Sequence, residues 1–167
     1  MHTATQENLE IASLHISANL QKARDNGRLY EVVDWMVMQA SLLRLQGDFS
    51  AATRALKAAH RLRAQPGVNI SFASFVTLSI ELERQRIRQR NWRGASSRLA
   101  AMQKIAASSQ HLLLSCDAAL LLAESSPNHT LKNYWLGVAR RVINAGYRFR
   151  SIDLLRIEAD GPYADLL

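Results

Sequence analysis

The segment from residue 28 to residue 64, RLYEVVDWMVMQASLLRLQGDFSAATRALKAAHRLRA, constrains the fold most strongly. Its apolar residues recur at helical spacing on both sides of Gly47 and Asp48. Glycine can adopt the left-handed conformation that ends a helix, and aspartate can cap the helix that follows. The segment therefore predicts two helices that are joined at Gly47-Asp48 and pack back to back.

Small and large side chains around that joint suit close helix packing. Ala40, Ala52 and Ala59 let two helices approach closely, whereas Phe49 and Leu56 fill the space beside them. The pattern resembles a tetratricopeptide-type repeat. A second copy follows at an offset of 43 residues, where Gly47-Asp48-Phe49 aligns with Arg90-Asn91-Trp92, Ala52 with Ala95, Leu56 with Leu99 and Ala59 with Met102.

Turn signals recur roughly every 20 residues, and residues 145–159 repeat the pattern of residues 26–40 more weakly. Only 7 Gly and 3 Pro occur in 167 residues, which argues against an all-β fold. We predict an all-α protein with one domain, residues 1–167, folded as a right-handed α-helical solenoid of tetratricopeptide-like antiparallel hairpins. Its seven to eight helices are expected at about residues 6–24, 29–46, 48–63, 71–89, 92–107, 110–124, 126–145 and 148–159.

The sequence favours a cytoplasmic location. Its longest apolar runs are far shorter than the ~20 residues that a membrane span requires, and the N-terminus lacks the pattern of a signal peptide. The single cysteine, Cys116, cannot form an internal disulfide and lies in an apolar helical stretch. We therefore expect a cytoplasmic protein without a membrane partner, in which Cys116 is an inert core residue.

No cluster of residues indicates a chemical reaction. The five histidines have no metal-ligand spacing, no G-x-S-x-G motif occurs, and the carboxylates are few and scattered. We expect neither enzyme activity nor a metal or cofactor. Trp35, Met36 and Met38 could form an apolar ligand cage, but their helical spacing favours the core.

The net charge is +7, and the most basic stretch runs from residue 84 to residue 104 without an acidic residue. Its basic residues are Arg84, Arg86, Arg88, Arg90, Arg93, Arg98 and Lys104. One interpretation is a solvated helix face, because arginine also suits the negative end of a helix. The other is an electropositive patch for an acidic peptide, a phosphorylated effector or nucleic acid. Trp92 could stack on a base there, although its repeat equivalent Phe49 favours packing.

Residues 24–63 carry a more specific resemblance. The string N-G-R-L-Y-E-V-V, followed by M-Q-A, L-Q-G-D and helically spaced Ala and Leu, resembles the helical-repeat region of the MalT-like regulators of the LuxR family. The resemblance implies a sensor module that receives an inducer or a regulatory protein. Neither the G-x-x-x-x-G-K-[ST] motif of such regulators nor a C-terminal helix-turn-helix pattern occurs. We therefore expect either an excised sensor module or a free-standing protein built from the same repeats.

The tetratricopeptide frame implies a ligand groove lined by the first helix of each hairpin. Transferred through the two joints, the frame predicts eight groove residues: Asp34, Val37, Ser41, Arg44, Thr77, Ile80, Arg84 and Ile87. Arg44 and Arg84 would share one wall, which suits a carboxylate or a phosphate. The expected ligand is an acidic protein or peptide, or a small effector.

The C-terminal segment is apolar for the end of a helical array. Ile152, Leu154, Leu155 and Ile157 cover more than one face of a short helix, so either the last residues or another chain must cover them. We predict an end interface at Leu154, Leu155 and Ile157 for a partner or a homodimer.

These features favour a non-catalytic regulatory module for protein interaction or effector sensing, part of or related to a bacterial transcription regulator. The alternative is a nucleic-acid-binding protein that uses the basic patch at residues 84–104. Affinity for generic nucleic acid that falls steeply with salt would indicate the alternative.

Overall fold

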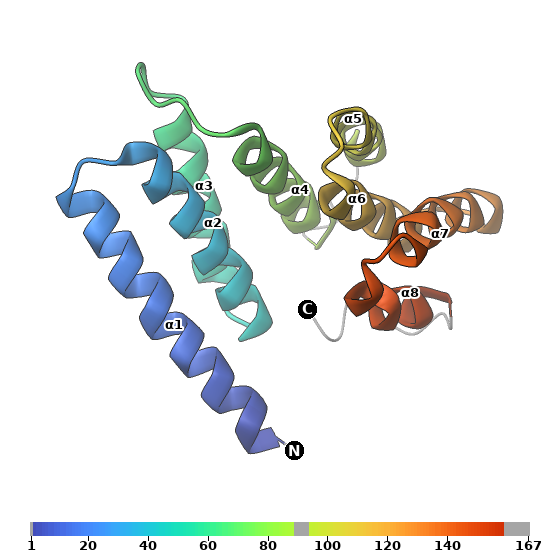
Figure 1. The fold of residues 1–167 in the computed structure, drawn as a ribbon, viewed down its shortest axis with the longest axis horizontal. Helices are drawn as coiled ribbons and strands as arrows, with labels where there is room; N and C mark the ends of the chain where they lie inside the picture. Colours follow the sequence, from blue (N-terminus) through green and yellow to red (C-terminus); the bar gives the residue numbers. More distant parts are fainter. Residues whose placement is uncertain (1, 89–93, 159–167) are drawn as a thin grey trace. The chain divides into compact units, whose positions relative to one another are not determined.

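The structure, a computed structural model, describes residues 2–88 and 94–158 (Figure 1). These residues form eight α-helices and a 3-10 turn, and the helices pack as sequential antiparallel pairs. The helices are α1 (His2–Asp25), α2 (Leu29–Leu45), α3 (Phe49–Arg63), α4 (Phe72–Arg88), α5 (Ala95–Ser108), α6 (Leu112–Glu124), α7 (His129–Asn144) and α8 (Ser151–Glu158), and the turn η1 (Arg148–Arg150) precedes α8. The prediction of an all-α protein is confirmed.

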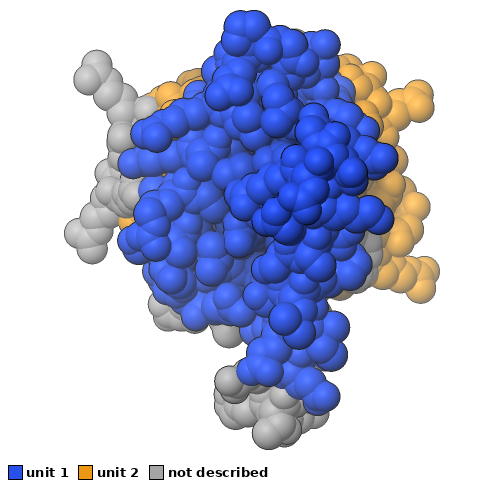
Figure 2. Space-filling model, turned by 90° about the vertical axis from the view of Figure 1, so that its left-hand side faces the viewer, with its two compact units in different colours: residues 1–81 blue, residues 82–167 orange. Residues whose placement is uncertain are grey.

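The chain divides into two compact units, Met1–Glu81 and Leu82–Leu167 (Figure 2). The division falls inside α4, so the first part of this helix belongs to the first unit and its last two turns belong to the second. Two parts of the sequence expectation, a single domain over residues 1–167 and a right-handed solenoid, remain predictions.

In the first unit, α2 packs against both α1 and α3. The joint between α2 and α3 has the predicted chemistry. Gly47 has a φ of +84°, and the carboxylate of Asp48 accepts a hydrogen bond of 2.8 Å from the backbone N–H of Ala51. Ala40, Ala52 and Ala59 are buried, as close packing of the helices requires.

In the second unit, α6 packs against α5 and α7, and α8 packs against α6 and α7. Small residues line the α6 side of this core, where Cys116, Ala119 and Ala123 are buried. The larger residues that fill it are Leu120 from α6, Leu136, Val138, Val142 and Ile143 from α7, and Leu154 and Ile157 from α8. The short α8 is therefore an integral part of the second unit's core.

The two proposed repeat copies share two of their three aligned packing positions; at the third, Ala59 is buried but Met102 is half-buried. Ala52 and Leu56 on α3 are buried, and so are their counterparts Ala95 and Leu99 on α5. The aligned joint, Arg90-Asn91-Trp92, lies outside the described residues. Instead, α5 begins after Gly94, whose φ is +72°.

Three local expectations need correction. The seventh helix begins at His129 rather than at Ser126-Pro127, because the side chain of Asn128 caps it by accepting a hydrogen bond from the backbone N–H of Leu131. The first helix begins four residues earlier than expected, at His2. Met36 is buried as expected, but Met38 is exposed on α2.

Among the helices that the structure describes, none is both long enough and apolar enough to cross a membrane.

Candidate functional site

The predicted groove residues lie on α2 and α4, mostly with little exposed surface. Val37 and Ile80 each expose only 3% of their surface. Asp34 and Ser41 on α2, and Thr77 and Ile87 on α4, are half-buried. The exposed area available to a ligand at these six positions therefore comes mainly from the four half-buried side chains.

The two groove arginines are buried as well. Nε of Arg44 lies 3.4 Å from Oε2 of Glu81, within the first unit, and both side chains are about nine-tenths buried. Arg84 is buried within the second unit's part of α4. The expectation that Arg44 and Arg84 form one ligand-binding wall remains a prediction.

The basic patch is organised around a buried carboxylate that immediately precedes it in sequence. Glu83 is almost fully buried, and both of its oxygens are bonded by Arg98 from α5: Nε lies 2.6 Å from Oε1 and Nη2 lies 2.8 Å from Oε2. Arg86 also donates to Glu83 from one turn away on α4. Two of the predicted patch arginines therefore already pair with the same carboxylate.

The other patch residues differ in their surroundings. Arg88 is half-buried; burial lowers the pKa of its guanidinium, and the charge of Glu124 on α6 acts in the opposite direction. Lys104 is exposed on α5. Arg90 and Arg93 lie outside the described residues. A sequence search for acidic residues between positions 84 and 104 misses Glu83 and Glu124. Glu83 lies just before this stretch, and Glu124 comes close to it only in the folded chain.

At the predicted end interface, two of the three residues are covered by the chain itself. Leu154 and Ile157 belong to the core that α8 forms with α6 and α7. Leu155, on the opposite side of α8, exposes 62% of its surface. Of the predicted interface, Leu155 alone offers a substantial apolar surface in the part of α8 whose side chains are described.

Sequence reasoning did not single out the apolar surface on α1. Ile11 and Leu14, three residues apart on this helix, expose 58% and 73% of their surface. Next to them, the ring of His15 packs edge-on against Trp35 of α2, with ring centroids 5.7 Å apart. Residues three apart are neighbours on one face of a helix, and we call the exposed pair of Ile11 and Leu14 the α1 patch.

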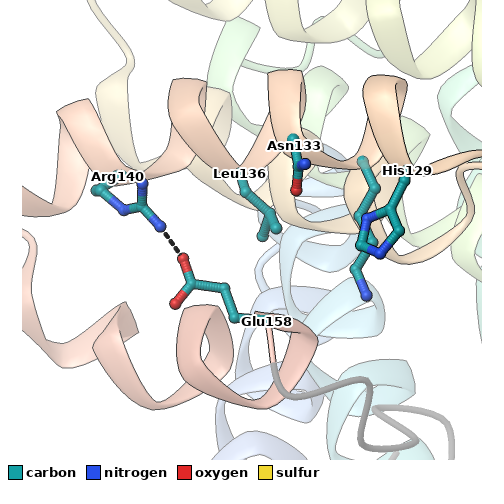
Figure 3. A pocket seen from close by; sticks show the side chains of 6 residues that line it. His129, Asn133, Leu136, Arg140 and Glu158 are labelled. Atoms are coloured by element: carbon teal, nitrogen blue, oxygen red, sulfur yellow. Dashed lines mark hydrogen bonds and ion pairs between the residues drawn. The ribbon is translucent and has the colours of Figure 1, made fainter.

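A pocket of about 270 Å³ lies between α7 and α8 in the second unit (Figure 3). Its lining consists of His129, Lys132, Asn133, Leu136 and Arg140 from α7 and Glu158 from α8. The guanidinium of Arg140 is paired with the carboxylate of Glu158 across the pocket. The α7 residues stand at positions 129, 132, 133, 136 and 140, a helical spacing that places them on one face of the helix.

Cys116 is fully buried at the centre of the second unit, and burial raises the pKa of its thiol to about 12. Its expected location in the core is confirmed.

In the described part of the chain, no three His, Cys, Asp or Glu side chains form a group that could hold a metal ion.

No family model matches the chain, and no curated protein or solved structure shows significant similarity to it. The resemblance to MalT-like regulators therefore stands on the quoted sequence pattern alone.

Proposed function

We propose that this protein is a non-catalytic, regulatory helical-repeat module, a solenoid of tetratricopeptide-like hairpins that binds a partner protein. The observation that carries the proposal is the exposed pair Ile11 and Leu14 on α1. α1 packs against α2, and Ile11 and Leu14 remain exposed to solvent on α1. Exposed helix faces normally carry polar side chains, so a pair of neighbouring apolar residues in solvent suits a docking partner.

The packing pattern supports the repeat interpretation. Ala52 and Leu56 in the first unit and Ala95 and Leu99 in the second are buried at matching positions. Proteins built from such repeats commonly act through extended surfaces rather than through enclosed active sites. The similarity to the sensor region of MalT-like regulators points in the same direction, towards a cytoplasmic module in transcription regulation.

The charge of the chain indicates the character of the partner. A net charge of +7 favours the approach of an acidic protein and raises its association rate. The partner that fits both features has an apolar segment to cover Ile11 and Leu14 and an excess of acidic residues around it.

The alternative, nucleic-acid binding through residues 84–104, is less well supported. Arg86 and Arg98 share the carboxylate of Glu83, and Arg84 is buried, so fewer cations of the described patch are available for phosphate groups than the sequence suggests.

Affinity purification with in vivo crosslinking, followed by titration of the purified partner, tests the proposal. We expect saturable binding of one protein that persists at about 0.15 M salt, and little affinity for random single-stranded or duplex oligonucleotides. Binding of random oligonucleotides with an affinity that falls steeply as salt rises would instead support the alternative.

A further inference from the structure

The pocket between α7 and α8 has the lining of an anion-binding site. Its six residues include two cations, Lys132 and Arg140, and one carboxylate, Glu158. Asn133 and His129 add an amide and a ring N–H that can donate hydrogen bonds. The lining therefore carries a net positive charge and several donors on a single helix face.

The position of the pocket on α7 adds to this electrostatic preference. His129 is the first residue of α7, where the helix dipole is positive. Two cationic residues of the lining, Lys132 and Arg140, follow on the same helix. The side chain of Leu136, which is buried, lies between those of Asn133 and Arg140 (Figure 3). Neither the helix terminus nor any one side chain makes the site. The half-open pocket brings these groups together.

The volume of the pocket limits the size of the group that it can hold. A pocket of about 270 Å³ suits a small molecule, and because it is about half open to solvent, part of the ligand can extend beyond it. A small molecule with one phosphate or carboxylate group and a short polar remainder fits this space.

The carboxylate of Glu158 is paired with Arg140, so it competes with an anionic ligand for this guanidinium. Their side chains are 55% and 29% exposed, so separating them costs little. An anionic group that enters the pocket can accept hydrogen bonds from Arg140 in place of the Glu158 carboxylate, and Lys132 adds a second cation to the lining. Glu158 therefore lowers the affinity for anions, while Arg140 and Lys132 provide it.

We propose that the α7–α8 pocket binds a small phosphorylated or carboxylate-bearing effector, held by Lys132 and Arg140 in competition with Glu158. This inference rests on the proposed regulatory function, since it identifies the place where a sensor module would receive an effector. It does not depend on the α1 patch, which lies in the other unit.

Isothermal titration calorimetry of the full chain at constant ionic strength tests the site, with glycerol 3-phosphate and inorganic phosphate as the probes. Removing a charge-assisted hydrogen-bond donor should weaken binding by about tenfold or more in Arg140→Gln and Lys132→Gln. Glu158→Gln should bind several times more tightly. The matched control is Arg141→Gln, which removes the same charge from an exposed residue of α7 outside the pocket lining.

Equal loss of affinity in Arg140→Gln and Arg141→Gln would show a general charge effect and overturn the proposal. Weaker anion binding in Glu158→Gln, or no heat with either probe in the wild-type protein, would also overturn it. Thermal unfolding of each variant shows whether the fold is retained, and Lys132→Gln provides the test if Arg140→Gln is unstable. Partner binding is measured separately, so an empty pocket in a protein that still binds its partner refutes the site and not the proposed function.

Discussion

Arg98 on α5 holds Glu83 on α4 through two hydrogen bonds, one to each carboxylate oxygen. The contact spans the short segment in which α4 ends and α5 begins. Gly94, just before α5, lies beside this contact. Its φ of +72° is a conformation that glycine adopts easily, and a Cβ at this position would lie 2.8 Å from Nη1 of Arg98. The stretch that looks purely basic in sequence is therefore anchored by an acidic residue.

Arg98→Ala should destabilise the protein by about 1–2 kcal/mol. The substitution leaves the buried Glu83 with a weaker set of donors, but Arg98 is half-exposed and Arg86 remains, so the loss is smaller than for a fully buried pair. Urea unfolding followed by circular dichroism measures the change. Arg141→Ala, at an exposed position of the same unit, should change stability by less than about 0.5 kcal/mol. Equal effects of the two substitutions would show that the Glu83 contact contributes nothing specific.

Two glycine substitutions should change stability in opposite directions. Gly94→Ala places a side chain at positive φ and against Arg98, and should cost about 1–2 kcal/mol. Gly137→Ala lies inside α7 with no atom within 4 Å of the new Cβ, and should stabilise the protein by about 0.5–1 kcal/mol. The same unfolding assay compares them. A stabilising Gly94→Ala would contradict the described start of α5.

The Cys116 thiol should react with iodoacetamide at pH 8 far more slowly in the native chain than in the urea-unfolded chain. Burial raises its pKa to about 12, so the native thiol stays protonated where an exposed thiol begins to ionise. The raised pKa also has a stability consequence. The buried, protonated thiol contributes its full share to the free energy of unfolding below the unfolded thiol pKa of about 8.5. This share is lost progressively as the pH rises towards 12. Cys116→Ala should lack this alkaline loss, and rapid native-state alkylation would refute the burial of Cys116.

Much of the local structure could be predicted from short-range patterns. The joint at Gly47-Asp48 and the buried Ala52 and Leu56 follow from backbone conformation, capping and side-chain size, which depend on neighbouring residues. The repeat alignment predicts that the fifth helix begins at about Trp92, whereas α5 begins after Gly94, a turn residue that the alignment does not take into account. Met38 was misplaced because almost the whole circumference of α2 is apolar, so periodicity alone does not identify the solvent side.

The candidate sites depended on contacts that a sequence does not display. Glu81 pairs with Arg44 across a separation of 37 residues, and Glu158 reaches Arg140 from another helix. The pocket exists only because α8 packs on α7. The helical spacing of His129, Lys132, Asn133 and Arg140 was the one signal that could have indicated a cationic face on α7.

The docking of a partner on the α1 patch is tested most directly by comparing Leu14→Glu with Leu155→Glu. Both substitutions place a carboxylate at a well-exposed leucine, on α1 in one case and at the sequence-predicted end interface in the other. Calorimetric titration with the identified partner should show at least about a tenfold loss of affinity for Leu14→Glu and little change for Leu155→Glu. Circular dichroism should show the same helical signal in both variants. Unchanged binding by Leu14→Glu would contradict docking on the α1 patch, and a clear loss of affinity in Leu155→Glu would place the docking surface on α8.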